Sequence, residues 1–159
     1  MSFRPKKKFE KNKISLVSPE SYRIGIVVSE WHSDITEVLY KGAEKILLSN
    51  GIKQENIIRK NVPGSFELPL GALRLIQKTK AIICLGCVIK GETDHFHFIC
   101  DAVANGIMKV SLKSNLPISF GVLTTNTIEQ AMERAGGKFG NKGEEAALVV
   151  LKMLTEKNG

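Results

Sequence analysis

Several side chains suited to chemistry lie just after predicted strands. Trp31 is the only tryptophan in the chain, and it offers a flat apolar surface on which a planar ligand could stack. Gly91 allows the backbone to approach a ligand closely, and the amides of Glu92 and Thr93 open a long predicted helix, a geometry that suits an anion such as phosphate. His95 lies in the first turn of that helix, where an imidazole can exchange protons near neutral pH.

These residues also have plainer interpretations. Trp31 is equally suited to capping the hydrophobic core. Glu67 follows the tight turn that Pro63-Gly64 favours and lies in the first turn of a helix, where a glutamate usually complements the helix dipole. Taken alone, Glu67 is therefore the weaker candidate for a binding residue.

Metal, redox and ATP chemistry are disfavoured by spacing. His97 lies about 200° round the predicted helix from His95, so the two imidazoles do not converge on a metal. Cys84 and Cys87 form a C-x-x-C pattern inside a strand, where positions three apart face opposite sides, so both are expected to be core thiols. The glycine-rich stretch 136–143 does not match the phosphate-binding pattern G-x-x-x-x-G-K-[ST]. These spacings therefore give no support to a metal, redox or ATP site.

The elements that must position these residues alternate regularly along the chain. Continuous apolar runs predict buried parallel strands, and the segments between them have helical periodicity. This alternation predicts an α/β fold with a four-stranded parallel sheet and helices on both faces. Ile14–Val17 is a further β-like run that could lie on a sheet edge of this subunit or of a neighbour. The predicted strands are 24–28, 57–62, 81–89 and 118–123, and the predicted helices are 34–49, 66–78, 94–114, 128–134 and 144–154.

Charge and composition limit the classes of function. The chain has 159 residues and a formal charge of +7, but residues 1–13 carry six basic side chains and one acidic one. Residues 14–159 are nearly balanced, which predicts a basic disordered arm followed by one globular domain without a general nucleic-acid surface. No apolar run is long enough to span a membrane, and residues 1–13 lack the features of a secretory signal. Three cysteines are an odd count, which favours reduced thiols and a cytoplasmic protein.

Four longer strings of sequence resemble the 6,7-dimethyl-8-ribityllumazine synthase family of riboflavin biosynthesis. They are SEWHSDITEVLYKGA (29–43), VPGSFELP (62–69), LGCVIKGETDHF (85–96) and FGVLTTNTIEQAMERAGGKFGNKGEEAA (120–147). The resemblance implies a flavodoxin-like, three-layer α/β/α fold. It also implies condensation of 5-amino-6-(D-ribitylamino)uracil with 3,4-dihydroxy-2-butanone 4-phosphate, with loss of phosphate and two waters and without metal or cofactor.

The resemblance also implies a role for each matching residue. His95 would be the catalytic proton donor, and Trp31 would stack on the pyrimidine. Other residues of the same subunit would hold the pyrimidine and its ribityl chain or bind the phosphate, and two more would come from a neighbouring subunit. The pyrimidine and ribityl contacts are Ser65, Phe66, Glu67, Cys87, Val88 and Ile89, the phosphate amides are Glu92 and Thr93, the neighbour's residues are Phe120 and Arg134, and Lys142 would be a second cation near the phosphate.

The family comparison implies an assembly as well. A site shared between subunits requires a homo-oligomer, and family members form pentamers, some of which pack into a hollow 60-subunit shell that can hold riboflavin synthase as cargo. The short link at 137–143 has the form that the resemblance associates with shells. Glu30-Trp31-His32 departs from the Arg-Phe-Asn that many members have, and Lys90 replaces a common Arg. We expect stacking to survive this change and the activity to be retained.

Two other classes of function compete with the enzyme. One is a shell or scaffold protein without synthase activity, with its basic arm facing an acidic partner. The other is a flavin-binding module of flavodoxin-like fold. His95, Arg134 and Glu67 favour the enzyme, because a scaffold has no need of these side chains.

Overall fold

The computed structural model describes residues 14–156. The predicted basic arm at residues 1–13 lies outside this range. Within residues 14–156, four strands and five α-helices alternate as the sequence predicts, and a small two-stranded ribbon and three short 3-10 helices are added. The strands are β1 (Ile24–Ser29), β2 (Ile57–Val62), β3 (Ala81–Ile89), β4 (Ile118–Thr125), β5 (Ala135–Gly137) and β6 (Gly140–Asn141). The helices are η1 (Pro19–Ser21), α1 (Ser33–Ser49), η2 (Gln54–Asn56), η3 (Ser65–Glu67), α2 (Leu68–Leu73), α3 (His95–Ser114), α4 (Ile128–Arg134) and α5 (Lys142–Thr155).

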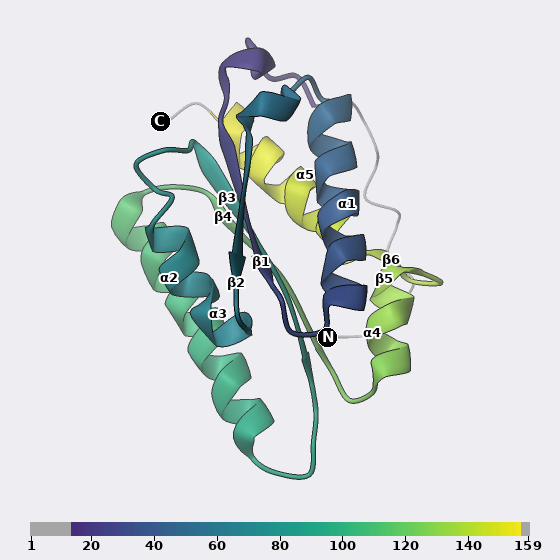
Figure 1. The fold of residues 1–159 in the computed structure, drawn as a ribbon. Helices are drawn as coiled ribbons and strands as arrows, with labels where there is room; N and C mark the ends of the chain where they lie inside the picture. The colour runs from purple at the N-terminus through teal and green to yellow at the C-terminus, as the bar shows by residue number, and fades with distance from the viewer. Residues whose placement is uncertain (1–13, 157–159) are drawn as a thin grey trace.

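The four main strands form one parallel sheet in the order β2-β1-β3-β4. Figure 1 shows α1 and α5 on one face of this sheet and α2 and α3 on the other. Every residue of β1 is buried, as expected for a central strand covered on both faces. The structure therefore confirms the predicted flavodoxin-like, three-layer α/β fold.

Each face of the sheet has its own hydrophobic core. Ile26, Leu39, Leu85 and Leu151 belong to the core under α1 and α5. Val27, Leu68, Ile82 and Val103 belong to the core under α2 and α3. Neighbouring residues such as Ile26 and Val27 alternate between the two cores because successive strand side chains point to opposite faces.

The predicted helix at 66–78 is shorter in the structure. It begins as η3, continues as α2 and ends at Leu73. Beyond it, Leu75 donates its amide to the carbonyl of Ala72, and Lys78 donates to Leu75. These turns bury Leu75 at a three-residue spacing, which imitates the periodicity of a continuous helix.

Two further differences concern short strands. Ile14–Val17 forms no strand in this chain, so its placement on an edge of this subunit's own sheet was wrong. Instead, the Ile14 amide donates to Oδ1 of Asn50 at 3.0 Å, and the segment packs on the core. The β5-β6 ribbon was not predicted, and it turns where Gly136 and Gly140 have φ values of 91° and 87°. None of the helices in residues 14–156 combines the length and apolar character that a membrane span needs.

Candidate functional site

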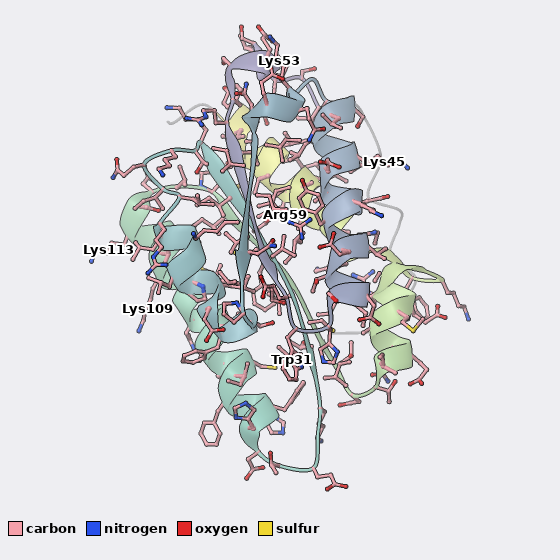
Figure 2. All side chains as sticks on the ribbon, viewed as in Figure 1. Trp31, Lys45, Lys53, Arg59, Lys109 and Lys113 are labelled. Atoms are coloured by element: carbon pink, nitrogen blue, oxygen red, sulfur yellow. The ribbon has the colours of Figure 1, made fainter. Side chains whose placement is uncertain are left out.

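The predicted site residues of one protomer gather at one edge of the sheet. All four main strands are parallel, so their carboxyl ends lie together, toward the lower end of the view in Figure 1. Figure 2 shows Trp31 at this lower end, beyond β1. The loops after β1, β2 and β3 all leave the sheet at this end, in the place where α/β sheets usually bind ligands.

The loop after β1 is held against the loop after β2 by two backbone hydrogen bonds. Glu30 donates to the carbonyl of Val62 at 2.8 Å, and Trp31 donates to the carbonyl of Pro63 at 3.1 Å. The Trp31 side chain is 70% exposed, so it does not cap the core of this protomer. Its indole face is therefore free to stack on a planar ligand or on a neighbouring subunit.

The loop after β2 presents one aromatic ring and one carboxylate. The Phe66 side chain is 56% exposed. Oε2 of Glu67 accepts a hydrogen bond from the Gly64 amide at 2.9 Å, which fixes the turn. Oε1 of Glu67 accepts no hydrogen bond from residues 14–156, so it can accept one from a ligand hydroxyl.

Ser65 differs from its neighbours in this loop. Its hydroxyl is buried and has no hydrogen-bond partner among the described residues. It lies directly against β3, because a Cβ added to Gly86 would come within 2.5 Å of the Ser65 Oγ. The Ser65 hydroxyl is therefore packed against β3 and does not face solvent.

The end of β3 supplies backbone groups and buried thiols. Cys87 is 2% exposed, whereas Val88 and Ile89 become half-buried toward the strand end. Burial raises the pKa of Cys87 to about 12, with a contribution from the charge of Asp34. Burial alone raises the pKa of Cys84 to about 12. The two thiols face opposite cores, which confirms that they are core residues.

The loop between β3 and α3 is exposed, including Glu92 and Thr93, and so is His95, the first residue of α3. The Thr93 hydroxyl accepts a weak hydrogen bond from the His95 amide at 3.4 Å. Asp94, the N-cap residue of α3, makes no side-chain capping bond. The start of a 20-residue helix therefore faces solvent beside the predicted catalytic imidazole.

The remaining three predicted residues lie away from this edge. Phe120 is on β4, an edge strand of the sheet. It lines a groove against α3 together with Ile107 and Met108. Arg134 ends α4 and Lys142 begins α5, and both contact Glu145. Within residues 14–156, no hydrogen bond or ion pair joins Arg134 or Lys142 to the loops after β1, β2 and β3. Figure 1 shows α4 beside α1, on the face of the sheet opposite α3.

The sequence did not point to Glu145. Its carboxylate accepts hydrogen bonds from Nη1 and Nη2 of Arg134 at 2.9 and 3.0 Å. Its pKa lies below the usual value, because the hydrogen bonds and charges of Arg134 and Lys142 outweigh the effect of burial, which alone would raise it. The one signal in the sequence was the three-residue spacing from Lys142 on a predicted helix.

Comparison with known proteins identifies the family of this chain. A family model described as 6,7-dimethyl-8-ribityllumazine synthase matches residues 21–158. A protein of that name from Cytophaga hutchinsonii is 62% identical over 134 residues, which cover 83% of this chain and 84% of that protein. Proteins of the same name from Bacteroides fragilis and Parabacteroides distasonis are 49% and 48% identical over 83% and 88% of this chain, and over 94% and 89% of their own lengths. The chain belongs to the 6,7-dimethyl-8-ribityllumazine synthase family.

Proposed function

We propose that this protein condenses 5-amino-6-(D-ribitylamino)uracil with 3,4-dihydroxy-2-butanone 4-phosphate to give 6,7-dimethyl-8-ribityllumazine, a step of riboflavin biosynthesis in the cytoplasm. The observation that carries the proposal is the family match over residues 21–158. The grouping of the loops after β1, β2 and β3 at one edge of the sheet supports it, because these loops hold most of the matching residues.

One protomer would supply the pyrimidine half of the site. The exposed face of Trp31 would stack on the pyrimidine, and the free Oε1 of Glu67 would accept a hydrogen bond from the ribityl chain. Ser65, Phe66 and the backbone of 87–89 would line the rest of the pocket. Such contacts favour reaction by holding the two substrates together in a reactive orientation.

The chemistry needs proton transfer and stabilisation of phosphate. The amine of the uracil adds to the ketone and loses water to form an imine, phosphate leaves, and ring closure with loss of a second water completes the lumazine. His95 would move the protons that imine formation and phosphate loss require. The backbone amides of Glu92 and Thr93 would bind the phosphate at the start of α3.

A neighbouring subunit would supply Phe120, Arg134 and Lys142. Support for this comes from α3, in which only Val103 and Ile107 are buried among 20 residues. Phe98, Met108 and Leu112 of the same helix are 73%, 58% and 74% exposed. Apolar side chains exposed together in this way are typical of a surface that another subunit covers. We therefore propose a homopentamer, assembled further into a 60-subunit shell with riboflavin synthase as cargo.

The direct test is product formation from the two substrates, followed by the absorbance of the lumazine. The purified protein is expected to form it without added metal. His95→Ala should reduce kcat strongly, by roughly 100-fold, while leaving KM for both substrates nearly unchanged. His97→Ala is the matched control, because His97 lies on another side of the same helix and packs edge-on against Phe96. Absence of product with the unaltered protein would contradict the proposal and favour a scaffold or a flavin-binding module.

Light scattering tests the assembly separately from the activity. A mass near that of 60 chains supports the shell, and a mass of five chains removes the shell while retaining the pentamer. An active monomer would contradict the proposal that Phe120, Arg134 and Lys142 act across a subunit boundary.

A further inference from the structure

The cluster around Glu145 fixes the direction of one guanidinium. Nη1 and Nη2 of Arg134 donate to the two carboxylate oxygens of Glu145 at 2.9 and 3.0 Å, which is a bidentate, end-on ion pair. Nη1 also donates to the backbone carbonyl of Phe139, in the turn between β5 and β6. Three acceptors from two elements thus hold one side chain.

The arrangement leaves one edge of the guanidinium unused. A guanidinium has five N–H donors in a rigid plane. Glu145 takes one donor from each Nη, and the Phe139 carbonyl takes the second donor of Nη1. The donors that remain are the Nε–H and the second Nη2–H, which point in the same direction and match two oxygens of a phosphate. Within residues 14–156, neither the Nε–H nor the second Nη2–H of Arg134 has an acceptor.

The local charge also suits an oxyanion. Lys142 places its Nζ 3.4 Å from Oε2 of Glu145, so two cations share one carboxylate. The cluster therefore keeps a net charge of +1 beside the free edge of Arg134. Glu145 orients the guanidinium without cancelling the attraction of the cluster for phosphate.

A contribution to folding stability explains the Arg134–Glu145 ion pair less well than the orientation of Arg134 does. The side chains of Arg134 and Glu145 are 30% and 32% exposed, and ion pairs this close to solvent contribute little to folding. A long, flexible arginine side chain loses conformational freedom when it binds a ligand, and that loss is smaller if the side chain is already fixed.

We infer that Glu145 is a positioning residue, which holds Arg134 with its Nε and Nη2 edge directed toward the phosphate of the four-carbon substrate. This inference rests on the proposed function, in which Arg134 binds that phosphate in the site of a neighbouring subunit. Glu145 itself touches no substrate. Its effect should therefore fall on the phosphate-bearing substrate alone.

The test compares E145Q and E145A with the unaltered enzyme and with E129Q as the matched control. Glu129 is an exposed residue of the same helix as Arg134. Both variants of Glu145 should raise KM for 3,4-dihydroxy-2-butanone 4-phosphate by roughly tenfold or more and leave KM for the uracil unchanged. Competitive inhibition by inorganic phosphate should weaken by a similar factor. E145D keeps the charge and should restore part of the affinity for both.

The outcomes separate the two proposals. Equal KM values for the phosphate substrate in E145Q, E145A and the unaltered enzyme would overturn the role of Glu145 and leave the proposed function intact. Equal increases of KM for both substrates, or a loss of assembly in both variants, would show a structural role instead and also overturn it. If the unaltered protein makes no lumazine, calorimetric titration with inorganic phosphate decides, and equal affinity of E145Q and the unaltered protein overturns the inference.

Discussion

His32 has the least common backbone conformation among the residues of the candidate site. It is the N-cap residue of α1 and has φ 59° and ψ 49°, in the left-handed region. Asn and His adopt this region more readily than most residues, whereas β-branched residues do so rarely. The left-handed turn at His32 is therefore compatible with His or Asn at this position.

Replacing His32 tests this explanation at the level of one residue. His32→Val should lower the free energy of unfolding by about 1–2 kcal/mol, because a β-branched side chain clashes in the left-handed conformation. His32→Asn should leave stability unchanged. Urea unfolding at a fixed protein concentration measures both, and a Val variant as stable as the Asn variant would refute the explanation.

For single residues, the sequence predicted which kinds of side chain follow the strands, but it did not predict which side chains contact one another. The positions of Trp31, Glu67 and His95 after β1, β2 and β3 follow from where these strands stop, so their placement could be predicted. The burial of the Ser65 hydroxyl could not, because it depends on how closely the loop packs on Gly86 of another strand. Glu145 was missed for a similar reason, since its partner Arg134 belongs to a different helix.

At the scale of elements, α1 and α5 pack unusually closely at one point. A Cβ added to Gly143 would lie 1.9 Å from the carbonyl oxygen of Leu39. This oxygen belongs to the backbone, so no side-chain rotation can relieve the clash. Asn141 strengthens the same contact. Its Oδ1 caps α5 by accepting from Gly143 at 2.8 Å, and its Nδ2 donates to the carbonyl of Val38 at 3.1 Å.

Gly143→Ala should therefore separate the two helices. We expect a loss of about 3 kcal/mol in the free energy of unfolding, at the upper end of overpacking effects. Gly91→Ala is the control for stability, because a Cβ there meets nothing within 4 Å. Urea unfolding measures the difference, and two variants of equal stability would show that α5 can shift without cost.

Long periodic elements were predictable and short ones were not. The bounds of β2 and β3 match the prediction, and those of α3 differ by one residue at the start. The β5-β6 ribbon was missed because five residues or fewer carry no periodicity, and its turns depend on positive φ at two glycines. The end of α2 at Leu73 was missed because the following turns keep a helical spacing of buried residues.

At the scale of the whole molecule, two partly exposed ion pairs predict a response to acid. The hydrogen bond and charge of Arg59 lower the pKa of Glu37, in spite of some burial, and the pKa of Glu145 is lowered as described above. Both groups therefore favour the ionised form in the folded state. Their contribution to stability is present above the ordinary glutamate pKa of 4.5 and is lost as the pH falls through their lower pKa values in the folded state.

The melting temperature should thus change little between roughly pH 5 and 7 and should fall below about pH 4.5. The double variant E37Q/E145Q should melt lower at neutral pH and lose less on acidification, whereas E129Q should follow the unaltered protein. Differential scanning calorimetry at fixed protein concentration measures this dependence. Parallel curves for the double variant and the unaltered protein would mean that other carboxylates govern the acid response.

The direction of the strands has a practical consequence for attaching other molecules. The candidate site lies at the carboxyl ends of the strands, whereas α5 runs toward the opposite end of the molecule and finishes there at Thr155 (Figure 1). A fluorophore or a fused peptide joined just after α5 would therefore lie at the end of the molecule opposite Trp31. Under the proposed assembly, a reporter at that end would follow subunit association without contacting Trp31 of the same chain.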